Sequence, residues 1–210
     1  RVADVLAAGA NKSAADVAQL GDALRQGGLV AAQTGLSLEE TAGVLSMFAD
    51  NALLGSDAGT SLKTFLQRLV PQSDEAAKAM ESLGLQFFDS QGAFVGIEEV
   101  AGQLQGALGG LSDEQRNAAL STLFGSDAVR SASILMDGGA ASVRDYTTAV
   151  SDQGAASRMA AEQLNNLAGD IEEFKGATET ALIRVGDLFD GVNRSVVQSG
   201  TDLDNVFNDF

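Results

Sequence analysis

The chain has 210 residues, of which 45% are hydrophobic, so it is long enough to bury one or two cores. Acidic residues outnumber basic ones 29 to 13, and the net charge of −16 disfavours tight binding to nucleic-acid phosphates. The absence of His and Cys removes the commonest general base, disulfides, thiol catalysis and zinc sites built from these residues. The longest charge-free stretches have 13 residues, short of the roughly 18 to 20 that span a bilayer.

The first expected helix follows Ser13, because Val17, Leu20 and Leu24 recur at spacings of three and four residues. Ser and Asp near its start suit a helix N-terminus, where they satisfy free backbone N–H groups. The pair Gly27-Gly28 is expected to end or kink this helix.

The next helices have clear start and stop signals. Residues 37–40, Ser-Leu-Glu-Glu, have the spacing of a capping box, in which the first and last side chains satisfy each other's backbone N–H groups. Gly55-Ser56-Asp57 restarts the chain into a helix that Pro71 stops, and a short helix is expected between Ser73 and Gly84.

Between Leu85 and Val95 the pattern changes to two short apolar runs around the turn-forming residues 89–92. This predicts a small β-hairpin over about residues 85–95. Because two strands alone are marginal, we expect the hairpin to pack on the helices through its Phe side chains.

Helical signals return at Ile97, and residues 112–115, Ser-Asp-Glu-Gln, form a second capping box. Gly125 restarts the chain into a helix that Gly138-Gly139 is expected to end.

Each capped helix is followed by the sequence Gly-Ser-Asp-Ala, at residues 55–58 and 125–128. This echo has two interpretations. Either it is the trace of an old duplication of a helix–turn–helix unit, or it arises because Gly, Ser and Asp are common at the ends of helices.

From about Gln153 onward the chain is expected to form one long helix. Its apolar positions alternate spacings of three and four residues, which is typical of a coiled coil, although Thr178 and Ala181 weaken the middle. The alternative is that this apolar stripe packs back on residues 1–150. The candidate oligomer-interface residues are Leu164, Leu167, Ile171, Phe174, Val185, Leu188 and Val192.

Together these elements predict an all-α fold. Residues 1–150 are expected to form a compact domain of short helices with one small β-hairpin, and residues 151–210 a long helix with a heptad seam. The chain begins in the middle of a pattern at Arg1, which we interpret as the sign of a piece of a longer protein.

No arrangement of residues predicts catalysis, a cofactor or a metal ion. The adjacent carboxylate pairs 39–40, 98–99 and 172–173 would point about 100° apart on a helix, which is typical of solvated faces. No Ser has a partner base at a suggestive spacing, and no Gly-rich loop carries a phosphate-binding Lys. We therefore predict a protein that is not an enzyme, with no catalytic, cofactor-binding or metal-binding residues.

Several short motifs, taken in order, are similar to those of one known family. They occupy residues 35–42, 55–60, 62–69, 83–92, 111–116, 123–125, 155–160 and 164–170. In order and spacing they resemble the core region of phage tail tape measure proteins, over roughly residues 1–190.

The resemblance implies a structural role in a phage tail. Tape measure proteins are long helical chains inside the growing tail tube, whose length they set, and they leave ahead of the DNA on infection. The implied partners are tail-tip proteins, the tube protein and assembly chaperones, with no specific nucleic-acid binding. Copies of the chain itself are expected too, with a trimer favoured and a hexamer allowed. The implied location is the virion tail lumen or tail tip, and the host cytoplasm during assembly.

The composition agrees with this role. A helix rises about 1.5 Å per residue, so its length is proportional to its number of residues and can set the length of a tail. An acidic chain repels DNA, which suits a tube through which DNA later passes. A compact domain over residues 1–150 suits an anchor at the tail tip better than a ruler.

Two other functions stay open at this stage. A membrane-active ejection or channel protein would insert its amphipathic stripes into lipid, although the negative charge disfavours anionic membranes. The second alternative is a generic bacterial helical adapter, which would be absent from purified virions.

Overall fold

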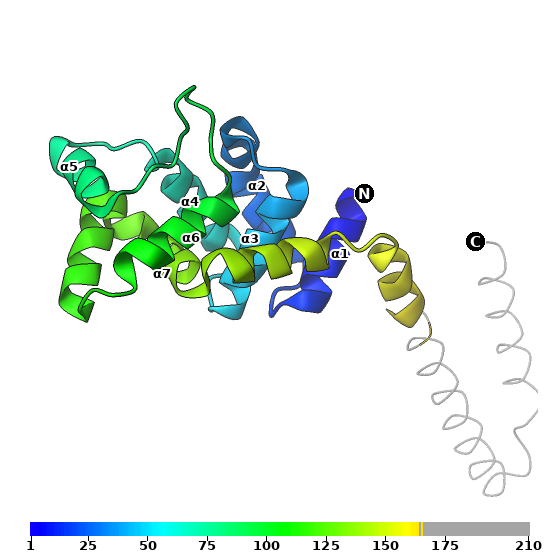
Figure 1. Ribbon diagram of the computed structural model, residues 1–210. Helices are drawn as coiled ribbons and strands as arrows, with labels where there is room; N and C mark the ends of the chain where they lie inside the picture. Colours follow the sequence, from blue (N-terminus) through cyan, green and yellow to red (C-terminus); the bar gives the residue numbers. More distant parts are fainter. Residues whose placement is uncertain (164, 166–210) are drawn as a thin grey trace, which may run out of the picture. The chain divides into compact units, whose positions relative to one another are not determined.

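The computed structural model describes residues 1–163 and residue 165, and residues 1–159 form one compact unit. The unit is built from helices, and the predicted all-α class is confirmed (Figure 1). Its helices are α1 (Val2–Lys12), α2 (Val17–Thr34), α3 (Leu38–Asp50), α4 (Gly55–Gln67), α5 (Asp74–Leu83), α6 (Ile97–Leu108) and α7 (Asp113–Val150). Another helix begins at Ala155. The proposed division at residue 150 stays a prediction.

The main core surrounds α3, in which the nine consecutive residues from Thr41 to Ala49 are all buried. Helix α7 passes along α3, α4 and α6, and α2 packs on α4 (Figure 1). Three fully buried aromatic side chains, Phe48, Phe65 and Phe124, fill the centre, and the last two stack with ring centroids 4.9 Å apart. The aromatic centre of the core is therefore shared by α3, α4 and α7.

The predicted end of a helix at Gly27-Gly28 is wrong, because α2 runs on to Thr34 and ends at Gly35. Gly27 instead allows α2 and α4 to approach closely. A Cβ atom at Gly27 would lie 2.7 Å from the carbonyl oxygen of Gly59, which is too close for any side chain. The side-chain cap of α2 is Asp16.

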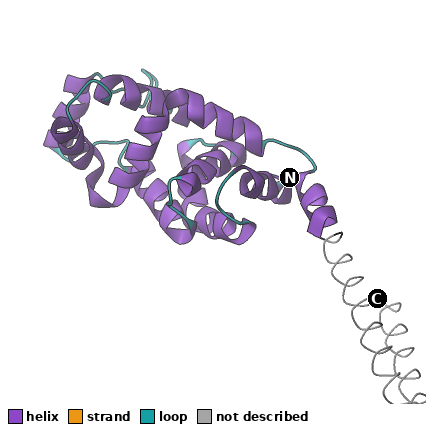
Figure 2. Ribbon diagram, turned by 90° about the horizontal axis from the view of Figure 1, so that it is seen from below, coloured by secondary structure: helices purple, strands orange, loops and turns teal. Residues whose placement is uncertain are grey.

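The predicted β-hairpin is also wrong, since no strand occurs in the part of the chain that the structure describes (Figure 2). Residues 85–96 form a loop with one isolated antiparallel bridge between Phe88 and Phe94. The Asp89 carboxylate accepts hydrogen bonds from the backbone N–H groups of Gln91 and Ala93, so a side chain shapes the turn. The expected packing through aromatic residues does occur, because Phe88 and Phe94 lie against the main core.

A side chain also replaces a strand partner at the start of this loop. The Gln103 amide on α6 accepts from the backbone N–H of Gln86 at 2.8 Å and donates to its carbonyl oxygen at 2.9 Å. This pairing explains why the apolar run before the turn stays a loop.

Helix α7 begins at the predicted capping box of Ser112 and Gln115. It is kinked at Gly125 and Gly139, where φ is 65° and 61°. The restart at Gly125 is confirmed, and so is the predicted end at Gly138-Gly139, because the backbone leaves the helical conformation at Gly139 as it does at Gly125. A further helical stretch follows to Val150, and the Gln105 amide lies where a side chain at Gly139 would be.

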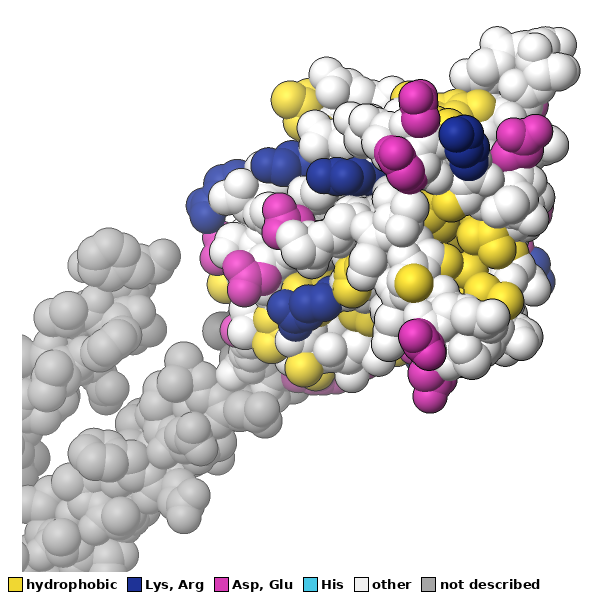
Figure 3. All heavy atoms as spheres, turned by 90° about the vertical axis from the view of Figure 1, so that its left-hand side faces the viewer, with side chains coloured by type: hydrophobic (Ala, Val, Ile, Leu, Met, Phe, Trp, Pro, Cys, Tyr) yellow, Lys and Arg dark blue, Asp and Glu magenta, His cyan; other side chains and the backbone are white. Residues whose placement is uncertain are grey.

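The surface mixes charge signs and small apolar groups. On the face that Figure 3 shows, Lys and Arg side chains are interspersed with Asp and Glu side chains. The large apolar side chains exposed among the described residues are single ones at separate sites in the sequence, namely Val2, Val17, Leu29 and Val70.

Candidate functional site

The candidate oligomer interface lies outside the described residues. This holds for all seven of its members, Leu164, Leu167, Ile171, Phe174, Val185, Leu188 and Val192. Within residues 1–163, no group of three or more acidic side chains is placed to hold a metal ion. No helix in this same part is both long and apolar enough to cross a membrane.

The two echoed segments of the sequence pack against each other. Ser61 and Ser131 stand six residues after Gly55 and Gly125, and their Oγ atoms are 3.1 Å apart in the core. The Ser61 hydroxyl also lies 3.0 Å from the carbonyl oxygen of Asp127. Equivalent positions of the two segments, Ser61 and Ser131, therefore contact each other.

A small cavity of about 270 Å³ lies beside this contact. It is lined by Leu53, Asp57, Thr60, Ser61, Ser126, Asp127 and Arg130. Asp57 and Asp127 are again equivalent positions of the echo. The echo thus has a packing role under either interpretation of its origin.

A polar junction joins α1, α3 and α7 around the only Tyr of the chain. The Asp50 carboxylate accepts hydrogen bonds from the backbone N–H of Ala14, at 2.7 Å, and from the Tyr146 hydroxyl. The Lys12 ammonium lies 5.0 Å from the centroid of the Tyr146 ring. Burial and the Asp50 contact raise the pKa of Tyr146 to about 12, so the phenol keeps its proton at neutral pH. Sequence reasoning missed this junction because nothing local links positions 50 and 146.

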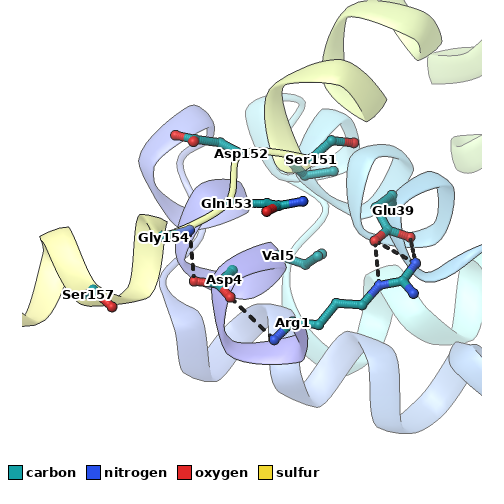
Figure 4. Close-up of a pocket in the computed structure, with 10 residues that line it drawn as sticks. Arg1, Asp4, Val5, Glu39, Ser151, Asp152, Gln153, Gly154 and Ser157 are labelled. Carbon is teal, nitrogen blue, oxygen red and sulfur yellow. Dashed lines mark hydrogen bonds and ion pairs between the residues drawn. The ribbon is translucent and has the colours of Figure 1, made fainter.

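The second junction lies where the chain leaves α7 and starts the next helix (Figure 4). Residues 151–154 form a turn over the starts of α1 and α3, and Gly154 has the left-handed φ of 82°. A cavity of about 670 Å³ opens beneath the turn. Its lining residues are Arg1, Asp4, Val5, Glu39, Val150, Ser151, Asp152, Gln153, Gly154 and Ser157.

The Asp4 carboxylate joins α1 to this turn. Its Oδ1 atom accepts a hydrogen bond from the backbone N–H of Gly154 at 3.2 Å (Figure 4). Because Arg158 donates its backbone N–H to the Gly154 carbonyl, the carboxylate lies at the N-terminus of the helix that begins there.

The other charged side chains around this cavity are paired. Glu39 accepts two hydrogen bonds from the Arg1 guanidinium, each 3.0 Å long, and Asp152 pairs with Arg158. The pKa of Glu39 is lowered, first by its own backbone N–H and then by Arg1. These contacts connect segments of the chain, and none of them places a nucleophile beside a base.

The comparisons with known proteins agree with the motifs. The family model for phage-related minor tail proteins matches residues 1–125. The chain is 35% identical to a tape measure protein of Pneumococcus phage Dp-1, over 98% of this chain and 18% of that protein. It is 30% identical to a probable tape measure protein of Escherichia phage P2, over 95% of this chain and 25% of that protein. No solved structure matches.

The resemblance to tape measure proteins is therefore confirmed. The chain spans 18% of the length of one relative and 25% of the other, so the similarity concerns one segment of much longer proteins.

Proposed function

The chain belongs to the phage-related minor tail protein family, and from this premise we propose that it is the core segment of a tape measure protein. The observation that carries the proposal is the similarity to two proteins of that name over almost the whole chain. A structural role in the tail of a virion accounts for both the family and the helical fold.

Within this role, residues 1–159 act as an anchor at the tail tip. Their helices fold back on one another around Phe48, Phe65 and Phe124, so the length of the unit is not proportional to its number of residues. An extended helix, in contrast, adds about 1.5 Å per residue and measures length. The segment after residue 159 is the part we assign to the ruler.

The partners follow from the same role. Copies of the chain associate through the heptad residues between Leu164 and Val192, as a trimer by preference or as a hexamer. Tail-tip proteins bind the anchor, the tube protein polymerises around the ruler, and assembly chaperones hold the chain in the host cytoplasm before that. On infection the chain leaves ahead of the DNA, which its negative charge repels.

Labelling of purified virions tests the anchor. A peptide tag inserted at Gly92, the tip of the exposed loop 89–93, gives a site for gold-conjugated antibody in electron micrographs. We expect gold at the tip of the tail and nowhere along the tube. Gold at the head end, or virions that contain no tagged chain at all, would contradict the proposal.

A further inference from the structure

The turn at residues 151–154 has an unusual kind of support. The helix that follows it receives its cap from a residue 150 positions earlier in the chain, since Asp4 accepts the hydrogen bond of Gly154. The N-caps of α2, α3, α5 and α7 bond within three residues of themselves. The capping of this helix therefore depends on α1 staying where it is.

The apolar support of the turn is small and separate from the main core. Val5, Ala8, Val150 and Ala155 belong to a second cluster of buried residues, in which most members are alanines. An alanine buries little area, so each of these contacts contributes far less than a buried Phe or Leu. Leu38, Ala156 and Met159 pack half-buried against this cluster, so the first turn of the new helix is held by a few small apolar contacts together with the Asp4 contact.

The turn also has room and freedom to move. Ser151, Asp152 and Gln153 are exposed, and the cavity of about 670 Å³ lies directly beneath them. Gly154 adopts a φ of 82°, which glycine reaches without the steric cost that other residues carry. A change of φ and ψ in this short turn would swing the helix without disturbing α7.

We propose that residues 151–154 form a hinge and that the Asp4 carboxylate is the latch that holds the helix beginning at Ala155 against α1. With the latch closed, the carboxylate accepts the Gly154 N–H and the Val5, Val150 and Ala155 side chains remain buried together. With the latch open, the helix turns away from α1 and its first turn loses its cap. The inference stands on this geometry and does not require the tail role.

Distance measurements between spin labels test the hinge in the full chain. The protein has no Cys, so labels at Ala32→Cys on α2 and Ser157→Cys on the new helix are the only ones attached. Both positions are exposed. We expect one narrow distance distribution in the parent protein. In Asp4→Ala we expect a broader one with a second population, because loss of an N-cap raises the open fraction about fivefold.

The control is Asp22→Ala, which removes an exposed carboxylate that pairs with Arg25 on the same helix. We expect it to leave the distance distribution as it is in the parent. A distribution in Asp4→Ala identical to that of the parent would overturn the latch. So would equal broadening by Asp22→Ala, because the effect would then not be specific to the contact with Gly154.

Two further measurements keep the test decisive if Asp4→Ala folds poorly. Asp4→Asn keeps the size of the side chain and one acceptor oxygen, and we expect it to broaden the distribution less than Asp4→Ala does. In the parent protein, the backbone amides of residues 158 and 159, which follow the first unpaired N–H groups of the helix, should exchange hydrogen at least tenfold faster than those of the buried residues 131 and 132. Equal protection of the two pairs of residues would mean that no separate hinge opening takes place.

Discussion

The main core and the exit from α7 are held together in different ways. Around α3, α4 and α7 the helices share buried aromatic rings and glycine contacts that leave no space between backbones. At the exit from α7, buried alanines and the Asp4 carboxylate hold the chain segments together. The body around α3, α4 and α7 should therefore resist local opening more than the junction at the exit from α7 does.

The largest expected effect comes from breaking the aromatic centre of the body. Phe65→Ala should lower the free energy of unfolding by about 3–5 kcal/mol, because Phe65 is fully buried and stacks on Phe124. Leu29→Ala is the control, since Leu29 is 72% exposed and should change stability by no more than about 0.5 kcal/mol. Urea unfolding measures both, and a loss below about 1 kcal/mol for Phe65→Ala would show that the body is loosely packed.

The next effect comes from forcing α2 and α4 apart. Gly59→Ala would place a Cβ atom 2.1 Å from the carbonyl oxygen of Ala23, so the backbones must separate, and we expect a loss of about 1–3 kcal/mol. In Gly21→Ala the new Cβ meets only open space, and higher helix propensity should stabilise the chain by up to about 1 kcal/mol. Equal melting temperatures for the two variants would contradict the close approach of these helices.

A smaller effect is expected at the exit itself. Val5→Ala removes two buried methyl groups from the second cluster, which is worth about 1.5 kcal/mol at about 0.8 kcal/mol for each group. Val2→Ala, at a side chain that is 56% exposed on the same helix, should have almost no effect. If chemical denaturation gave Val5→Ala a loss as large as that of Phe65→Ala, the contrast between the two regions would disappear.

The smallest expected effect concerns the Tyr146 junction and occurs only at alkaline pH. The pKa of Tyr146 is about 12 in the folded chain and 10.0 for an unperturbed Tyr, so the contribution of the protonated phenol to stability is fully present below pH 10 and is lost as pH rises through about 12. Because the chain has one Tyr and no Trp, absorbance at alkaline pH reports this group alone. Asp50→Asn should lower the pKa toward 10, and an unchanged titration curve would contradict the Tyr146–Asp50 contact.

Local signals in the sequence predicted local structure well. The capping boxes that begin at Ser37 and Ser112 are present as predicted, because such a box needs only residues three positions apart. Gly84 ends α5 in the left-handed conformation that a helix C-terminus favours. The all-α class follows from the sum of these signals.

The errors of sequence reasoning have long-range causes. The predicted helix end at Gly27 is wrong because this glycine serves a close approach to Gly59, a partner far away in the sequence. The contact between Asp4 and Gly154 is equally invisible, since no spacing rule joins positions 150 residues apart. The close approach of two helices, and a helix cap supplied by a residue far away in the sequence, both depend on the tertiary fold. A short window of sequence cannot predict them.

Measuring tail length in virions tests whether the segment after residue 159 sets the length of the tail. One, two and four heptads would be deleted between Leu164 and Val192 in the full-length protein, which leaves the register of the seam intact. Four heptads are 28 residues, or about 42 Å of helix. If this segment is part of the ruler, the tails should shorten in proportion to the deletion, by about 10 Å for each heptad. Tails of unchanged length in all three deletions would contradict the assignment of this segment to the ruler.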